Sequence, residues 1–299
     1  MNYKYDRNNI RFVKYRLEII LVVGLKEKLM NEWVSIIKNI NKSIARIVLY
    51  SEGEIVSEGT GTIINSSGIV LTAWHVVETC NYFISEKKDY SLFVFTSEGR
   101  FLYNLCSSQF FIGIPLLEKE KLELEIDLAL LEPLLPIKFE HYLSPVLSNI
   151  EIEMGADLLM CGYSEETPSF MDFRSIAAKM FKGQLTDELK KEMKLNEGSL
   201  KPPTYKSGIL AHTTHVYVEN PSLHYQQLHI DNGAHGGMSG GPVVDSEGRF
   251  IAVLVQRTIV RSNVMAEGTL LKFEVPSGNS IAITLNFLEH IFYKSNFRL

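Results

Sequence analysis

The chain has 299 residues, of which 45% are hydrophobic and 22% are charged, and its formal net charge at pH 7 is −5. This is an ordinary globular composition, with enough apolar material for one large or two modest domains. The mild acidity, without any long block of Lys or Arg, gives no electrostatic reason to expect a nucleic-acid partner.

The three cysteines, Cys80, Cys106 and Cys161, are odd in number and widely spaced. That pattern is unlike a disulfide framework or a zinc site, and it predicts small buried thiols. We expect neither a metal nor a cofactor. Sparse cysteines also favour a reducing compartment, so we expect a cytoplasmic location.

The N-terminal segment, residues 1–43, combines a basic stretch with the short apolar run 19–25. Charged residues close this run, no small-residue cleavage site follows it, and it is too short to span a bilayer as a helix. We therefore expect an untranslocated docking segment or a short strand or helix, and no transmembrane span. Residues 29–44 carry Trp and Ile at helical spacing, which predicts one amphipathic helix packed on the body.

From Ile44 onward the chain consists of short β-rich runs separated by turn signals. Many short strands at such spacing favour a barrel or a sandwich over a parallel α/β sheet. The expected strands are Ala45–Tyr50, Gly59–Ile64, Ile69–Thr72, Ser91–Thr96, Gly99–Tyr103, Leu128–Leu131, Asp157–Gly162, Gly208–Val218, Gly241–Val244 and Phe250–Val255.

One stretch, from about 165 to 205, interrupts this β pattern. It is polar, rich in Lys and Glu, and its apolar residues recur at helical spacing, as Ile176 and Met180 do. The stretch predicts a helical insertion on a β scaffold. Its apolar stripes must be buried against the scaffold, the N-terminal helix or a partner.

The strongest chemical signal is the run Gly237-Met238-Ser239-Gly240-Gly241-Pro242. A serine is a weak nucleophile at neutral pH, so it needs a base for its proton and donors for the oxyanion that forms. Small neighbours let backbone N–H groups approach a substrate carbonyl, and Gly237 and Ser239 are spaced to supply two such donors. Alone, the run also fits a glycine-rich hairpin with an incidental serine.

A histidine follows a short expected strand in Leu71-Thr72-Ala73-Trp74-His75-Val76-Val77. Packing at a rigid strand end would hold His75 in place, as a general base requires. The ordinary alternative is a core or surface histidine, because the chain has 8 His.

The third signal is a carboxylate at the mouth of an apolar strand, where Asp127 precedes Leu128–Leu131. A buried Asp costs free energy unless it is paired. A His N–H is a suitable partner, and the pair fixes the tautomer that the base requires. The alternative is an Asp that only caps the strand. The nearby Glu123 and Glu125 would point differently from Asp127 or lie outside the strand.

These three segments, in the order His, Asp, Ser, resemble the trypsin-like peptidases, and most closely their bacterial HtrA and V8-like branch. The likeness covers roughly residues 40–292. Gly59–Ile64 resembles that branch's strand before the catalytic His, and Asp127–Leu131 resembles its catalytic-Asp strand. Leu270–Ser277 is similar to its last strand, after which Ser277 would cap a C-terminal helix through Ile291.

The resemblance implies an all-β, chymotrypsin-like fold of two packed antiparallel six-stranded β-barrels. We expect the first barrel, with His75 and Asp127, in residues 44–148. The second barrel, with Ser239, the helical insertion and the C-terminal helix, is expected in residues 149–299. The triad would then lie between the barrels. The likeness implies no PDZ domain, because no residues remain after the terminal helix.

The resemblance also implies a substrate pocket and two departures from the family pattern. Gly233, six residues before Ser239, stands at the base of the S1 pocket, where an Asp would signal a preference for Arg or Lys. The other expected pocket residues are Ala234, Leu254, Val255 and Gln256. Since the wall is small and apolar, we expect a small or hydrophobic P1 residue. The departures are Trp74, where the family usually has a small residue, and His235, four residues before Ser239.

The implied function is a serine endopeptidase that cleaves protein or peptide substrates through an acyl-enzyme, with His75, Asp127 and Ser239 as its triad and with Gly237 and Ser239 forming its oxyanion hole. One alternative is an enzyme kept latent, with a regulatory partner acting at the insertion 165–205 or the N-terminal segment. Another is a catalytically silent protease-fold binding or regulatory module. We expect the insertion to gate the active site or to recruit the substrate protein, and decoration is the simpler alternative.

Overall fold

The computed structural model of the protein describes residues 32–52, 54–107, 110–117, 120–165, 202–218, 223–266, 269–286 and 288. The apolar run 19–25 and nearly all of the expected insertion therefore lie outside the described residues. The chain divides into two units, Met1–Asn39 and Ile40–Leu299. In the first unit the described residues, from 32 onward, are helical, where the sequence predicted a helix.

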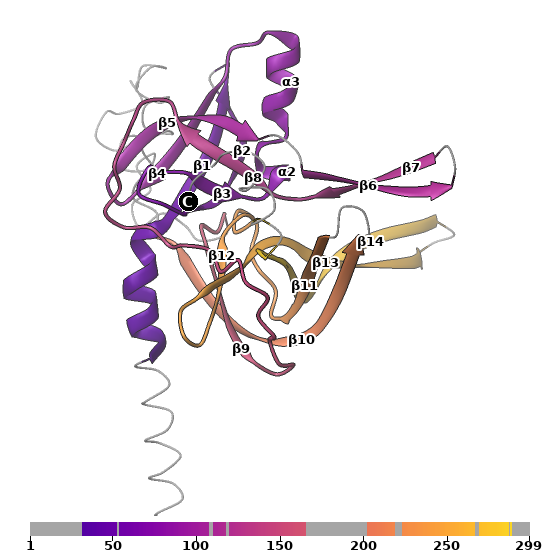
Figure 1. The fold of residues 1–299 in the computed structure, drawn as a ribbon. Coiled ribbons are helices and arrows are strands. Elements are labelled where there is room, and N and C mark those ends of the chain that lie inside the picture. Colours follow the sequence, from indigo (N-terminus) through magenta and orange to yellow (C-terminus); the bar gives the residue numbers. More distant parts are fainter. Residues whose placement is uncertain are drawn as a thin grey trace, which may run out of the picture. The chain divides into compact units, whose positions relative to one another are not determined.

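The first barrel closes in the order β1-β2-β3-β8-β5-β4, with every neighbouring pair antiparallel (Figure 1). Successive side chains of a strand point to opposite faces, so every second residue of a strand points into the barrel core. The strands are β1 (Ile44–Ser51), β2 (Glu54–Ile63), β3 (Val70–Thr72), β4 (Ser91–Thr96), β5 (Gly99–Ser107) and β8 (Ala129–Pro133).

The second barrel closes in the order β10-β11-β14-β13-β12-β9. Its core holds Leu158, Met160, Leu228, Ile230 and Leu254, all at most 1% exposed. Two closed six-stranded antiparallel barrels confirm the predicted chymotrypsin-like fold class. The strands are β9 (Asp157–Gly162), β10 (Thr204–Val218), β11 (Leu223–Asp231), β12 (Pro242–Asp245), β13 (Phe250–Ala266) and β14 (Thr269–Thr284).

Several elements were not predicted from the sequence. β6 (Phe110–Leu117) and β7 (Glu120–Ile126) form a two-stranded hairpin that extends beyond the barrels (Figure 1). The alternation of polar and apolar residues along β7 carries a strand signal that the sequence analysis left unused. The short helices are η1 (Asn41–Ser43), α2 (Trp74–Val77) and α3 (Thr79–Glu86), and β11 was also missed.

The expected start of the C-terminal helix at Ser277 is wrong. β14 continues to Thr284 and pairs with both β13 and β11 through Ile281–Ile283. Ala282 and Ile283 are buried, so ending the strand at Ser277 would leave a gap in the barrel wall. The Ser277 hydroxyl instead accepts the N–H of Asn279 at 3.3 Å, beside Gly278 with its positive φ of 90°. The serine thus supports a local turn within the strand.

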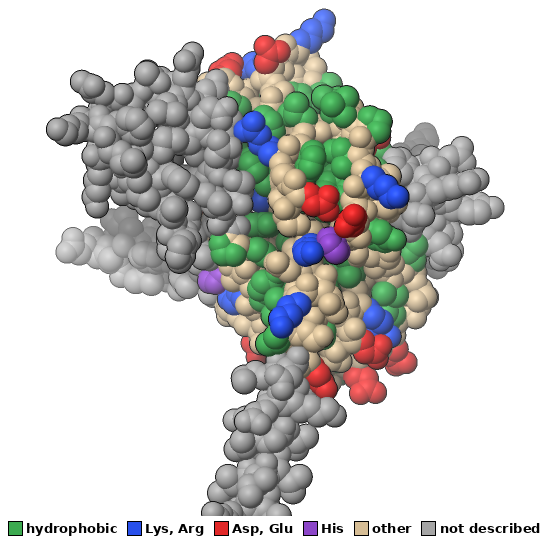
Figure 2. Space-filling view, turned by 90° about the vertical axis from the view of Figure 1, so that its left-hand side faces the viewer, with side chains coloured by type: hydrophobic (Ala, Val, Ile, Leu, Met, Phe, Trp, Pro, Cys, Tyr) green, Lys and Arg blue, Asp and Glu red, His purple; other side chains and the backbone are tan. Residues whose placement is uncertain are grey.

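Figure 2 shows one face of the molecule, on which Lys and Arg side chains do not gather into a single patch. In the part of the chain that the structure describes, no helix is long and apolar enough to cross a membrane.

Candidate active site

His75 lies in α2, a four-residue helix directly after β3, and not on the strand end expected from the sequence. Its neighbours Trp74 and Val76 are only 5% and 2% exposed, whereas His75 itself is exposed. Gly59 of β2 allows this arrangement, because a Cβ on it would lie 2.5 Å from a Val76 methyl group. The Ser57 hydroxyl also donates to the Val76 carbonyl at 2.7 Å. Packing on both sides therefore fixes the helix that presents His75.

Asp127 lies between β7 and β8 and directs both of its carboxylate oxygens at His75. Oδ1 accepts the backbone N–H of His75 at 2.9 Å, and Oδ2 lies 2.7 Å from His75 Nδ1. A carboxylate accepts only, so Nδ1 carries the proton and Nε2 is left as the basic nitrogen. The side chains of His75 and Asp127 remain 41% and 32% exposed. This geometry favours an orienting partner for His75 over a strand cap.

The pKa of His75 is raised above its ordinary value of 6.5. Partial withdrawal of the imidazole from water lowers the pKa and is the largest single cause, although the side chain remains 41% exposed. The hydrogen bond and negative charge of Asp127, together with the charge of Glu78, outweigh it. The protonated ring is thus stabilised by the two carboxylates beside it.

Ser239 comes from the second barrel and is tied to the first through Thr60 of β2. The Thr60 N–H donates to the Ser239 carbonyl at 2.8 Å, and the Thr60 hydroxyl donates to the Gly237 carbonyl at 2.7 Å. Thr72, at the end of β3, donates its hydroxyl to the Thr60 carbonyl at 2.6 Å. Because β3 leads directly into α2, these buried bonds hold the serine turn beside the segment that carries His75.

Gly240 shows how closely the two barrels approach at this point. A Cβ on it would lie 2.1 Å from the Thr60 carbonyl oxygen, 2.2 Å from Thr72 Oγ1 and 2.9 Å from the Ala73 nitrogen. Its φ is +85°, a left-handed conformation that favours glycine. Only a residue without a side chain lets Ser239 lie this close to β3.

We expect Gly240→Ala to destabilise the protein by more than about 3 kcal/mol, because both the conformation and the clash are unfavourable. Gly155→Ala is the matched control, since Gly155 has a similar φ of +87° but nothing within 4 Å of its Cβ position. The free energy of unfolding of the control should fall only by the cost of the left-handed conformation, about 1–2 kcal/mol. Chemical denaturation measures both losses, and equal losses would contradict the close approach at Gly240.

The turn before Ser239 presents two backbone donors. Gly237 has a φ of +82°. The Gly236 carbonyl accepts the Glu165 N–H at 2.8 Å, and the Gly237 carbonyl accepts the Thr60 hydroxyl at 2.7 Å. Within the described residues, the N–H groups of Gly237 and Ser239 have no hydrogen-bond partner. Two unengaged N–H groups two residues apart are the arrangement that a substrate oxyanion needs.

The expected pocket residues lie on two segments that flank this turn. Leu254 exchanges backbone hydrogen bonds with the serine turn, accepting from Gly240 N–H at 2.7 Å and donating to the Gly241 carbonyl at 2.9 Å. Leu254 and Val255 are buried, whereas Gln256 is exposed. The wall strand therefore runs beside Ser239.

The other pocket segment carries Gly233 and Ala234 and is fastened to β14. Ala234 N–H donates to the Ser280 hydroxyl at 2.7 Å, and that hydroxyl donates to the Asn232 carbonyl at 2.7 Å. A Cβ on Gly233 would lie 3.3 Å from the Cα of Gly278, so these two glycines are neighbours.

Three functional candidates were missed by sequence reasoning: Thr60, Ser280 and Lys206. Thr60 stands inside the run Gly59–Ile64, so its motif was noticed but its contacts were not. Ser280 lies in the segment wrongly expected to be helical. Lys206 of β10 donates its ammonium to the Gly233 carbonyl, a contact that no local pattern signals.

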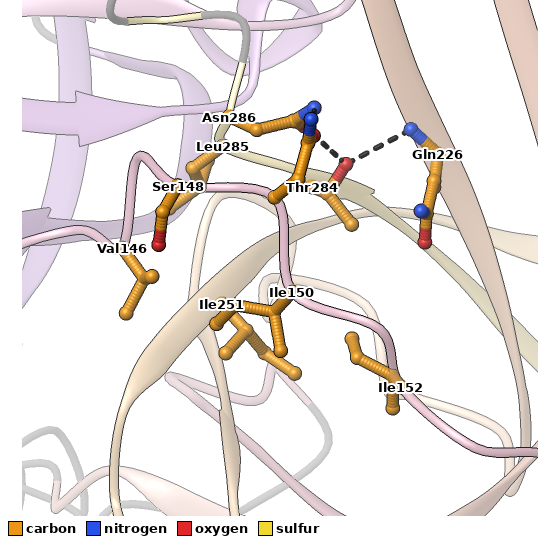
Figure 3. Close-up of a pocket in the computed structure, with 10 residues that line it drawn as sticks. Val146, Ser148, Ile150, Ile152, Gln226, Ile251, Thr284, Leu285 and Asn286 are labelled. Atoms are coloured by element: carbon orange, nitrogen blue, oxygen red, sulfur yellow. Dashed lines mark hydrogen bonds between the residues drawn. The ribbon is translucent and has the colours of Figure 1, made fainter.

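A crevice on the second barrel lies where the connector between the barrels crosses it (Figure 3). Ile150 and Ile152 of the connector face Ile251, and Thr284 accepts the Gln226 N–H at 2.9 Å. None of the expected triad or pocket residues lines it. We therefore assign it to packing of the connector. Among the described residues, no cluster of three or more His, Cys, Asp or Glu is placed to hold a metal ion.

Comparison with known proteins gives one family match. Residues 59–253 match the model described as a trypsin-like peptidase domain. No curated protein matches the chain. Among solved structures, the chain is similar to a serine endoprotease from Yersinia pestis, with a TM-score of 0.50 and 16% identity over 87% of this chain and 64% of that one. It is also similar to an inactive mutant form of Rv3671c from M. tuberculosis H37Rv, with a TM-score of 0.46 and 15% identity over 87% and 90%.

Proposed function

This chain belongs to the trypsin-like serine peptidases and is a serine endopeptidase, and from that premise we propose that His75, Asp127 and Ser239 are its catalytic triad. The bidentate contact of Asp127 with His75 is the observation that carries the proposal. It occurs beside the serine turn, which Thr60 and Thr72 hold against the same barrel.

In the proposed mechanism, Ser239 Oγ attacks the carbonyl carbon of the scissile peptide bond and His75 Nε2 takes the hydroxyl proton. Asp127 holds the imidazole and stabilises the imidazolium that forms. The N–H groups of Gly237 and Ser239 donate to the oxyanion of the tetrahedral intermediate. His75 then protonates the leaving amine, and a water activated by the same nitrogen releases the acyl group from Ser239.

The proposal is tested by digesting an unbiased peptide library and identifying the products by mass spectrometry, with Ser239→Ala as the blank. We expect internal cleavages that are absent from the blank. Cleavage that appears only after a partner is added or the chain is nicked would instead identify a latent enzyme. Binding of peptides without any cleavage, in wild type and blank alike, would identify a silent binding module.

Latency is the second candidate, and one contact favours it. Glu165 N–H holds the Gly236 carbonyl at 2.8 Å, next to the proposed oxyanion donor Gly237. The Gly236 carbonyl and the Gly237 N–H belong to one peptide group, so this hydrogen bond fixes the direction of the Gly237 N–H. Glu165 itself lies outside the turn that carries Ser239. A regulatory partner that moved Glu165 would change the oxyanion hole without touching the triad.

The proposed base also predicts a pH dependence. His75 must be neutral to accept the serine proton, and its pKa is raised, so kcat/KM should fall with a midpoint above pH 6.5 as the solution is acidified. Glu78→Gln removes one negative charge that favours the imidazolium, so the midpoint should move to lower pH. Glu86→Gln, an exposed control on α3, should leave the midpoint unchanged. Hydrolysis of a small peptide ester measures all three profiles, and an upward shift in Glu78→Gln would contradict the assignment.

A further inference from the structure

Two pairs of histidines face each other across the hairpin that β10 and β11 form. His212 stands directly opposite His229. His215 pairs with Gln226, so it lies diagonally across from His224. Because side chains alternate between the two faces of a strand, the two pairs lie on opposite faces of the hairpin. These four residues are half of the 8 His in the chain, and none of them belongs to the proposed triad or to the expected pocket.

The pair His215 and His224 brings two ring nitrogens together. His215 Nδ1 lies 3.3 Å from His224 Nε2, and the planes of the two rings differ by only 3°. At this distance one ring donates its N–H to the other. Two ligand nitrogens of a tetrahedral zinc ion, each about 2.0–2.1 Å from the metal, lie about 3.3–3.4 Å apart. A zinc ion can therefore replace the hydrogen-bonded proton while the two nitrogens keep their spacing.

The other pair, His212 and His229, lacks this geometry. Its rings are tilted by 46°, and His229 Nε2 lies 3.2 Å from the Thr214 hydroxyl. Among the described residues, no hydrogen bond joins a nitrogen of His212 to a nitrogen of His229. The two pairs belong to the same two strands, so the second pair is an internal control for the first.

The pair His215 and His224 lies where the hairpin has no third strand beside it. β10 pairs with β9 only as far as Ile209, and β11 pairs with β14 only over the residues 227–230. Within the described residues, the outer parts of β10 and β11 pair with each other alone. A two-stranded ribbon is marginally stable in water. A metal ion that joins the two strands would stabilise the part of the hairpin that needs it most.

Two carboxylates lie on the same side of β10 as this pair. Glu151 and Glu153 of the connector between the barrels line a hollow of about 370 Å³ together with His215. The connector is fastened there, because the Gly155 N–H donates to the Leu210 carbonyl at 2.8 Å. Carboxylate oxygens are zinc ligands, and their charge also raises the local concentration of cations. Water or one of these carboxylates can fill the remaining positions around the ion.

We propose that His215 and His224 form a binding site for a divalent transition metal ion, which joins β10 to β11. Imidazole nitrogens suit Zn²⁺, Cu²⁺ and Ni²⁺, whereas Mg²⁺ and Ca²⁺ take oxygen ligands. The site goes beyond the proposed function, because no step of peptide cleavage uses it. It also departs from the expectation of no metal, which rested on the cysteines and did not consider histidines from two strands.

The test is calorimetric titration of Zn²⁺ into protein without a histidine tag, at about pH 7.5, where an ordinary histidine is neutral. We expect one ion to bind with a Kd of about 50 µM or tighter. His215→Ala and His224→Ala should each weaken binding by about tenfold or more. The control variants His212→Ala and His229→Ala should keep the wild-type affinity, and Mg²⁺ should not compete.

Hydrogen exchange of the wild type locates the ion. At a Zn²⁺ concentration ten times the Kd, the amides of residues 213–217 and 223–226 should exchange about tenfold more slowly, because the ion opposes local opening of the hairpin. This measurement decides the matter if a histidine variant does not fold.

Binding weaker than about 50 µM in the wild type would overturn the proposal. Unchanged affinity in His215→Ala and His224→Ala would overturn it as well, because the ion would then bind elsewhere, for instance at His75. Equal losses in the variants of both pairs, or protection from exchange only outside this hairpin, would also contradict it.

Discussion

Ser239→Ala is expected to lower turnover of a peptide substrate by about 10⁶ and to leave the fold intact. Loss of the attacking hydroxyl removes the acyl-enzyme route, and losses of this order follow removal of a nucleophile that acts together with its base. Residual hydrolysis would come from the oxyanion donors and from substrate binding alone. The measurement is kcat on a peptide ester and on a protein substrate, with the melting temperature as a check of folding.

Ser246→Ala is the matched control for this loss. Ser246 is an exposed serine in the turn between β12 and β13, on the same barrel as Ser239. The control should retain wild-type turnover. A Ser239→Ala protein that folds and keeps more than about one hundredth of the wild-type kcat would assign the nucleophile to another residue.

Asp127→Asn is expected to lower kcat by about 10⁴ while the protein remains folded. The amide has nearly the shape of the carboxylate, so packing is preserved. Its nitrogen is a donor, however, and a donor opposite Nδ1 favours the tautomer with the proton on Nε2, where the base must accept one. The amide also removes the charge that stabilises the imidazolium.

Asp89→Asn is the matched control, because Asp89 is an exposed aspartate of the first barrel. This variant should keep wild-type kcat. If Asp127 only capped its strand, Asp127→Asn would behave like that control. Activity near wild type would then transfer the orienting role to Glu123, Glu125 or another carboxylate. The same substitution removes the hydrogen bond and the charge that raise the pKa of His75 most. The midpoint of the residual kcat/KM against pH should therefore move to lower pH.

The three motif segments and the barrel architecture were predictable because their signals are local. Each motif is a run of a few residues around His75, Asp127 or Ser239, and each strand shows its own alternation of apolar residues. The order of the motifs along the chain then suffices to indicate the family. The contacts among the motifs could not be predicted in this way, because Thr60 and Ser239 lie far apart in the sequence.

The features that the sequence analysis missed depend on pairing between distant segments. Ser277 has the side chain of a helix N-cap, and the same side chain supports a turn within a strand. Only the pairing of β14 with β11 and β13 decides between the two. Lys206 is likewise an ordinary lysine in its own strand, and its contact with Gly233 arises from the closure of the second barrel.

The central claim is that Ser239 is a nucleophile activated by His75 and Asp127. A fluorophosphonate probe, which reacts with activated serines, tests it most directly when the modified residue is mapped by mass spectrometry. We expect the wild type to be modified at Ser239, His75→Ala and Asp127→Asn to react far more slowly, and Ser239→Ala not to be modified. Modification at another residue, or reaction of His75→Ala at the wild-type rate, would contradict it.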